Sequence, residues 1–206
     1  MQMRGIDISR WQGNINFENV KKSGIDFVII KAGGSDDGFY TDKKFYTNYE
    51  NAIGAGLHVG TYYFVGKNCN SYENGVINAN EFYKIIQGLK FDMPVIIDFE
   101  VGNPNNKIGN TNACVGFCQF MENLNYYAMI YASDISGFKD KLNLNGLTAF
   151  DKWVARYGSK PKYVKSFGIW QYTSDGNING INGRVDMNIS YNDYPSIIKR
   201  KHLNNY

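Results

Sequence analysis

The sequence predicts an α/β fold, an irregular (β/α)8 TIM-like barrel with a degenerate second half and an active site at the C-terminal ends of its strands. Apolar segments of strand length alternate with helical segments along the first half of the chain, which is typical of a parallel sheet. Several of these strands are apolar throughout, as expected where both faces of a sheet are covered. Eight such segments occur, the number that closes this barrel, although 206 residues fall short of the usual ~250.

The first half is expected to hold four strand–helix units. Gly24 and Gly56 follow two of the helical segments and end them, because glycine readily adopts the left-handed conformation found after a helix. Phe45, Tyr49 and Ala52 recur at helical spacing in the second unit. The expected elements are, in order, a strand at residues 3–7, a helix at 17–23, a strand at 27–32, a helix at 43–55, a strand at 58–64, a helix at 74–87, a strand at 94–100 and a helix at 112–123.

The second half has shorter connections and less helix. No linker, internal repeat or low-complexity tract interrupts it. We therefore expect one domain over residues 1–198 and a short tail at residues 199–206. The expected strands lie at residues 128–132, 152–157, 167–172 and 183–188, with a loop-rich stretch after the first and a short last element at 194–198.

The net charge of the chain is concentrated in that tail. The 22 Lys and Arg residues outnumber the 19 Asp and Glu residues by three, and the tail (KRKHLNNY) holds three cations and no anion. Residues 1–198 are therefore neutral, which argues against nucleic-acid binding, because that would require a basic face on the folded part. The longest apolar runs are far shorter than the ~20 residues of a membrane span, so no membrane insertion is expected. No feature points to an obligate protein partner.

The available residue types restrict the chemistry. The chain has three cysteines without a CxxC pair and two histidines, so neither a metal site nor a cofactor is expected. Cys69, Cys114 and Cys118 are expected to be reduced thiols, the last two on one helix face. Catalysis must then use carboxylates, hydroxyls and aromatic rings.

Acids occupy three of the expected strand ends. Asp7 ends the first strand, Asp98 and Glu100 end the fourth, and Asp186 lies in the eighth. The i, i+2 spacing of Asp98 and Glu100 places both on one strand face, with carboxyl groups about 5 Å apart, near the spacing of retaining glycosidases. Two carboxylates at that distance raise the pKa of one of them, which provides an acid beside a carboxylate. This pattern favours glycosidic bond cleavage.

Buried acids need partners, and Lys31 and Arg156 are the candidates. A salt-bridged or helix-capping role for the acids is the alternative to catalysis. Aromatic residues near the strand ends suggest a sugar substrate, because sugar rings stack on aromatic faces. About half of them are expected to be packing residues, Tyr63 and Trp170 first, since strand alternation turns these two away from the lumen. The aromatic residues are Trp11, Tyr62, Tyr63, Phe64, Tyr131, Trp153, Tyr157, Trp170 and Tyr172.

Six segments carry a further signal: DISRWQG (residues 7–13), FVIIKA (27–32), AGLHVGTYYF (55–64), IIDFE (96–100), KWVARYG (152–158) and IWQYTSDGNINGINGRVDMN (169–188). Taken together in this order, they resemble glycoside hydrolase family 25, the Chalaropsis-type lysozymes. The opening D-x-S-x-W-Q-G, the D-x-E and the closing V-D-x-N are specific in combination, although each alone is weak. The resemblance runs through nearly the whole chain.

The resemblance implies an N-acetylmuramidase that cleaves the β-1,4 bond between N-acetylmuramic acid and N-acetylglucosamine in peptidoglycan, with retention, and so lyses bacterial cell walls. By position, Glu100 is similar to the general acid of the family. Asp98 is similar to the second carboxylate, which either attacks the sugar or steadies an intermediate formed by the substrate's own acetamido group. Asp7 and Asp186 match two further acids of the site. The substrate-binding candidates, from the resemblance and the strand-end positions together, are Lys31, Tyr62, Phe64, Tyr131, Trp153, Tyr157, Gln171 and Tyr172.

Two other functions stay open. A chitinase-like glycosidase also uses D-x-E with acetamido assistance, but its longer D-x-x-D-x-D-x-E motif would require acids at Met93 and Ile96. A catalytically inactive sugar-binding barrel is expected to lack one of the acids, and none is missing.

The site of action follows from the resemblance and from the N-terminus. No apolar signal segment precedes the first strand, so no secretory signal peptide is expected. Many phage endolysins belong to the family, which implies a phage or prophage enzyme held in the host cytoplasm until holin pores release it to the wall. Residues 199–206 would then begin a linker to a cell-wall-binding module.

Overall fold

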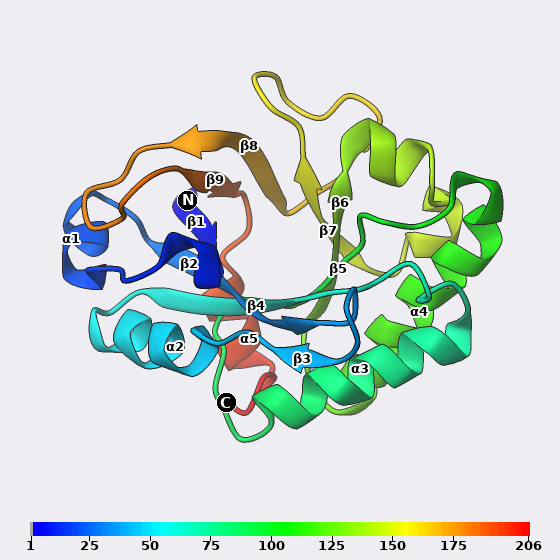
Figure 1. The fold of residues 1–206 in the computed structure, drawn as a ribbon, viewed down its shortest axis with the longest axis horizontal. Coiled ribbons are helices and arrows are strands. Elements are labelled where there is room, and N and C mark those ends of the chain that lie inside the picture. Colours follow the sequence, from blue (N-terminus) through cyan, green and yellow to red (C-terminus); the bar gives the residue numbers. More distant parts are fainter. Residues whose placement is uncertain (1) are drawn as a thin grey trace.

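The structure of the chain, a computed structural model, describes residues 2–206. Within these residues the strands are β1 (Met3–Ile8), β2 (Phe27–Gly34), β3 (Tyr40–Thr41), β4 (His58–Phe64), β5 (Val95–Asp98), β6 (Ala128–Ser133), β7 (Asp151–Ala155), β8 (Ile169–Gly176) and β9 (Val185–Ser190). Eight of them close into a barrel in the order β1, β9, β8, β7, β6, β5, β4 and β2, and the pairing of β2 with β1 completes the ring (Figure 1). The expected α/β barrel is therefore confirmed.

Helices cover the first half of the barrel far more than the second. They are α1 (Phe17–Lys22), α2 (Phe45–Gly54), α3 (Tyr72–Ile86), α4 (Lys107–Asn123) and α5 (Tyr194–Arg200). The long helices α3 and α4 pack side by side outside the barrel (Figure 1). After β6 the connections are loops and two short turns, η3 (Asp134–Lys139) and η4 (Leu144–Leu147), so the second half is degenerate as expected. No helix in the described range 2–206 is both long and apolar enough to cross a membrane.

One barrel strand runs against its neighbours. β9 is antiparallel to both β8 and β1, whereas the other neighbouring strands of the barrel are parallel. The expectation of a parallel sheet is wrong for β9. Residues 177–184 join β8 to β9 without a helix, and a parallel neighbour would need a crossover of a dozen or more residues. The sequence prediction also missed β3, a pair of residues that extends the end of β2 antiparallel to it.

Most element boundaries differ by a few residues from the sequence prediction, those of β5, β7 and α4 among them. β5 ends at Asp98 and β7 at Ala155, each two residues earlier than expected. α4 begins at Lys107, five residues earlier, because the side chain of Asn106 accepts a hydrogen bond from the Gly109 backbone and caps the helix. The early ends of β5 and β7 matter for the site, since functional side chains follow both strands.

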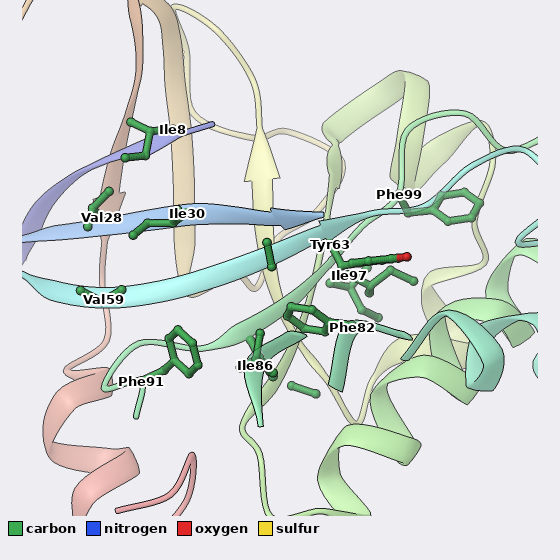
Figure 2. Close-up of a cluster of buried hydrophobic side chains, with 14 of the residues drawn as sticks. Ile8, Val28, Ile30, Val59, Tyr63, Phe82, Ile86, Phe91, Ile97 and Phe99 are labelled. Atoms are coloured by element: carbon green, nitrogen blue, oxygen red, sulfur yellow. The ribbon is translucent and has the colours of Figure 1, made fainter. Parts of the chain in front are cut away.

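The strands bury side chains on both faces. Phe27 and Ile29 of β2 point into the barrel, and the alternating Val28 and Ile30 pack outward against the helices. Figure 2 shows the outer layer, in which strand residues face the helix α3. The ring of Tyr63 lies 5.5 Å from that of Phe82 in this layer, so the expectation that Tyr63 points away from the lumen is confirmed. The two helical cysteines are buried one turn apart on α4, also as expected.

The C-terminal residues close the lower end of the barrel. Tyr194 and Ile198 of α5 belong to the interior cluster, and α5 continues to Arg200, past the boundary expected at residue 198. Asn204 is fully buried: its Oδ1 accepts from the Tyr127 backbone (2.7 Å), and its Nδ2 donates to the carbonyl oxygens of Phe91 and Met93 (3.0 Å each). The residues expected to form a separate tail therefore pack on the barrel, because the polar groups of its lower end need these partners.

We expect Asn204→Ala to lower the free energy of unfolding by at least about 1–3 kcal/mol, since it leaves buried backbone groups without hydrogen bonds. Urea unfolding followed by circular dichroism measures this. Asn182→Ala, at an exposed position, is the control and should be near neutral. Equal stability of the two variants would contradict a structural role for the C-terminal residues.

Candidate active site

The four strand-end acids meet at one mouth of the barrel. Asp7 lies near the end of β1, Asp98 ends β5, and Glu100 follows two residues later. Asp186 is the second residue of β9, not its C-terminal end, so the sequence argument for Asp186 was wrong about the strand direction. Because β9 is antiparallel, its beginning lies beside the end of β1, and Asp7 and Asp186 are direct cross-strand partners. All four acids line one cavity of about 180 Å³.

Asp98 and Glu100 form a pair in direct contact. A hydrogen bond between their two carboxyl groups affects the pKa of each. The chain leaves the strand after Asp98, which allows Glu100 to turn back towards it. Burial raises the pKa of both carboxyl groups, and the charge of Glu100 raises the pKa of Asp98 further. The pair therefore holds a proton under conditions in which exposed carboxyl groups are ionised.

One carboxyl oxygen of Asp98 lacks a hydrogen-bond donor in the described part of the chain. Among the described residues 2–206, no N–H or O–H group donates to its buried Oδ1. Asp7 differs, because its Oδ2 accepts hydrogen bonds from Gln171 Nε2 (2.9 Å) and Asn188 Nδ2 (2.8 Å). A buried carboxyl oxygen without a donor is costly unless it is protonated or a ligand supplies the donor. Asp98 is thus suited to receive an N–H or O–H group of a substrate.

A hydrogen-bond network holds Asp7 in place. The Tyr131 hydroxyl donates to Gln171 Oε1 (2.9 Å), and the Trp153 indole N–H donates to Asn188 Oδ1 (2.8 Å). These bonds orient the two amide groups so that both NH₂ ends face Asp7. Burial raises the pKa of Asp7, and the charge of Asp186 adds to the effect; burial and the charge of Glu100 raise the pKa of Asp186 as well. The cavity floor therefore holds fewer negative charges than its four acids suggest.

The raised pKa of Asp7 makes stability depend on pH. The pKa of Asp7 is about 8 in the folded chain, whereas an ordinary Asp has a pKa of about 4. Between these two values the folded chain keeps a proton that the unfolded chain releases, so the free energy of unfolding falls as the pH rises from about 4 to about 8. Asp7→Asn keeps an acceptor for Gln171 and Asn188 and carries no charge. We expect the free energy of unfolding to fall less between about pH 5 and about pH 8 in this variant than in the parent chain. Urea titrations at both pH values measure the difference.

The control for that experiment is Asp26→Asn, at the opposite end of the barrel. It should retain the pH slope of the parent chain. An Asp7→Asn slope equal to that of the parent would contradict a protonated Asp7 in the folded state.

Two lysines act on the acid pair. The Lys31 ammonium lies 4.6 Å from the centre of the Phe64 ring, and its charge offsets part of the pKa increase of both Asp98 and Glu100. Lys141 donates to the main-chain oxygen of Glu100, and its charge also lowers the Glu100 pKa. Lys31 therefore acts on the acids through its charge, although it forms no ion pair with them among residues 2–206.

Arg156 is not a partner of the acids, and that expectation is wrong. Its guanidinium binds Asp134 (2.9 Å) in the wall beside the site. Asp134 is buried and also accepts from the backbone of Lys162, Tyr163 and Val164. These donors favour the charged carboxylate and lower its pKa despite burial. Arg156 thus anchors the loop that follows β7.

The structure brings most, but not all, of the substrate-binding candidates together. The cavity of the acids is also lined by Tyr62, Tyr131, Trp153, Tyr157 and Gln171. Neither Lys31 nor Phe64, over whose ring the Lys31 ammonium lies, lines the cavity. Tyr172 lies outside it, 5.7 Å from the ring of Trp170, because Gln171 points inward and its neighbours on the strand therefore point outward.

Sequence reasoning missed three features of the site. Asn188 follows Asp186 by two residues in the V-D-x-N motif, so strand alternation could have placed it on the same face. Lys141 lies in a segment without any motif, and no sequence signal marks it. The third is a neighbouring cavity of about 390 Å³ between β6, η3 and β7, which shares Glu100, Tyr131 and Tyr157 with the first. Within the described residues 2–206, no cluster of three or more His, Cys, Asp or Glu side chains could hold a metal ion.

Comparisons with known proteins agree with this geometry. The chain is 34% identical over 188 residues to the autolytic lysozyme of Clostridium acetobutylicum, covering 90% of this chain and 55% of that protein. It is 30% identical over 207 residues to lysozyme M1 of Streptomyces globisporus, covering 90% of this chain and 67% of that protein. The crystal structure of the CTP1L endolysin superposes with a TM-score of 0.83 at 26% identity, over 96% of this chain and 70% of that one.

The chain thus spans about half the length of the clostridial relative. The sequence profile of the glycosyl hydrolases family 25 matches residues 6–181, which include the two paired acids and Asp7. The expectation drawn from the six sequence segments is confirmed: the chain belongs to the glycosyl hydrolases family 25.

Proposed function

We propose that the chain is a lysozyme that hydrolyses the β-1,4 bond between N-acetylmuramic acid and N-acetylglucosamine in peptidoglycan. The observation that carries the proposal is the contact between Asp98 and Glu100 at the floor of an open cavity, with a buried oxygen of Asp98 that lacks a donor. The similarity to two proteins named lysozymes supports the substrate. Peptidoglycan glycan strands are accordingly the proposed binding partner.

The proposed reaction begins with proton transfer from Glu100 to the glycosidic oxygen as the bond from that oxygen to the anomeric carbon breaks. The acetamido oxygen of the sugar that carries this anomeric carbon attacks it, and Asp98 accepts a hydrogen bond from the acetamido N–H. Water then attacks the anomeric carbon from the face that the leaving group occupied, the bond from that carbon to the acetamido oxygen breaks, and the Glu100 carboxylate takes a proton from the water. Two inversions at one carbon give net retention.

The hydrogen bonding of Asp98 favours this route over direct attack by Asp98. Its buried Oδ1 has no donor among residues 2–206, and an acetamido N–H would supply one. Asp98 is therefore better placed to orient the acetamido group than to attack the sugar.

Substrate binding would also prepare the acid. The two carboxyl groups share a proton at rest, and Asp98 is the more deeply buried of the two. A hydrogen bond from the substrate N–H stabilises the charged form of Asp98, so the shared proton moves to Glu100. The general acid would thus become protonated where the sugar is bound.

Analysis of the new reducing ends in digested peptidoglycan tests the proposal. A muramidase releases muramic acid at the reducing end. Glucosamine ends would indicate a glucosaminidase or a chitinase-like specificity, and the absence of new ends together with wall binding would indicate a sugar-binding barrel. Either of the last two outcomes would overturn the proposed reaction.

We further propose that the chain is the catalytic part of an endolysin, on the basis of its likeness to the CTP1L endolysin. In this proposal, holin pores release the enzyme to the wall, and a wall-binding module follows residue 206. Expression inside a bacterial host tests the first part: lysis should require a pore-forming protein. Comparison of the wall affinity of this chain with that of the full gene product tests the second part, and equal binding would contradict it.

A further inference from the structure

Trp11 is exposed at the mouth of the barrel. It is 77% exposed, more than any other large apolar side chain in residues 2–206. It lies four residues after Asp7, so the two Cα atoms are at most about 14 Å apart. An exposed indole near a catalytic cavity is suited to stack on a ligand ring, because its face is large and apolar.

The turn that carries Trp11 is held rigidly. It is the 3₁₀ turn η1 (Arg10–Gln12), and Ser9 caps it. The Ser9 hydroxyl accepts from the Trp11 backbone (3.3 Å), and the Gln12 side chain accepts from the Ser9 backbone (2.9 Å). Gly13 ends the turn with φ 65°, a conformation that favours glycine. The D-x-S-x-W-Q-G motif thus builds a fixed support for the indole ring.

Cations and rings connect Trp11 to the acids. The Arg10 guanidinium lies 4.9 Å from the centre of the Trp11 ring and 5.9 Å from that of Tyr40 on β3. The Lys31 ammonium lies 5.5 Å from the Tyr40 ring and acts on Asp98. Arg10 covers one face of the indole, and the side chain as a whole is 77% exposed. We call Trp11, Arg10 and Tyr40 the Trp11 platform.

The Trp11 platform and the cavity of about 390 Å³ lie on opposite sides of the mouth. β1, which leads into η1, and β6, which leads into the cavity wall, are four strands apart in either direction around the ring of eight. Glu100 lines that cavity, whereas Asp98 does not. Because the general acid faces the leaving oxygen, the cavity is on the leaving-group side of the bond, and the platform is on the other side.

We propose that the Trp11 platform is a distal sugar-binding site, in which the face of the indole opposite Arg10 stacks on a saccharide of the glycan strand on the non-reducing side of the cleaved bond. The proposal rests on the proposed function. The ligand is a neutral sugar ring. Its C–H groups would pack on the apolar face of the indole, and its hydroxyl groups would form hydrogen bonds with the Arg10 guanidinium and the Tyr40 hydroxyl. A glycan strand bound at the acids is continuous with this position.

The first test compares Trp11→Ala, Trp11→Phe and the parent chain on soluble, uncrosslinked glycan tetrasaccharides and octasaccharides. The loss of kcat/KM in Trp11→Ala should grow with strand length and reach about tenfold on the octasaccharide, the order expected for one lost stacked ring. Trp11→Phe should recover part of it. Tyr72→Ala removes an exposed ring from the outer helix α3 and should match the parent at each length. A loss independent of length would overturn the proposal.

Product analysis tests the side on which the platform binds. Without a distal site on the non-reducing side, the favoured cleavage position in the octasaccharide should move towards the non-reducing end. A shift towards the reducing end would overturn the assignment of the side.

A binding experiment keeps this inference separate from the proposed function. In Glu100→Gln, titration with the octasaccharide should change tryptophan fluorescence, chiefly through Trp11, the most exposed of the three tryptophans. Trp170 is half-buried and Trp153 is buried. The double variant that carries both Glu100→Gln and Trp11→Phe should lose most of that change in fluorescence. An undiminished change would overturn the platform whatever the reaction is, whereas a failure of the parent chain to release reducing ends would overturn only the proposed reaction.

Discussion

Replacement of Glu100 by glutamine is expected to abolish nearly all lysis of bacterial walls while leaving the fold intact. Glutamine fills the same space at the cavity shared by the acids but has no proton to give to the leaving oxygen. General acid catalysis contributes about 10²–10⁴-fold to such reactions, so activity should fall by at least two orders of magnitude. Clearing of a turbid wall suspension measures lysis, and thermal unfolding followed by circular dichroism reports the fold.

The matched control is Glu81→Gln. Glu81 lies on the outer helix α3, away from the acids, and pairs with Lys84, so its replacement should leave lysis unchanged. Activity of Glu100→Gln above a tenth of that of the parent chain would exclude the acid role. A loss of activity together with unfolding would instead assign Glu100 to stability.

Asp98→Asn is expected to reduce kcat by about 10²–10³-fold. The variant loses the negative charge of the carboxylate, which would stabilise the positive charge that develops on the acetamido group during its attack. The asparagine keeps an acceptor oxygen, so the KM should change less than kcat. Since burial and Glu100 raise the Asp98 pKa, removing this carboxyl group also removes a proton-sharing partner of Glu100. The alkaline limb of the pH–rate profile, which reports loss of the proton from the general acid, should therefore move. Initial rates on soluble glycan across pH measure both effects.

Asp26→Asn serves as the control here as well, since it makes the same chemical change at the opposite end of the barrel. Wall lysis by Asp98→Asn at the rate of the parent chain would contradict the paired-acid mechanism. A rate loss without any change in the pH profile would mean that Asp98 acts without sharing a proton with Glu100.

Much of the barrel could be predicted from local patterns. The apolar runs and the glycine stops located the eight barrel strands and the four outer helices to within a few residues, because these depend on neighbouring residues and on the burial of both sheet faces. The direction of β9 could not be predicted, since a strand has the same residue pattern in either direction. Asp186 was placed at the correct mouth by an argument that assumed the wrong direction.

The site was predictable to the extent that strand alternation determines it. Asp7, Asp98 and Gln171 face the lumen by alternation, and Tyr172 faces away by the same rule, although it had been expected to bind substrate. Lys141 reaches Glu100 from a loop, and the chain offers no periodicity by which a loop side chain can be placed.

The sequence by itself determined the barrel class, the family and the acids at the mouth, because strand periodicity and short motifs are local properties. Only the tertiary structure decided the contact between Asp98 and Glu100, the packing of residues 199–206 on the barrel and the position of Trp11 opposite the second cavity. These depend on where the chain leaves a strand and on which distant groups need hydrogen bonds. The point where the chain leaves a strand and the pairing of distant polar groups both depend on the closed barrel as a whole.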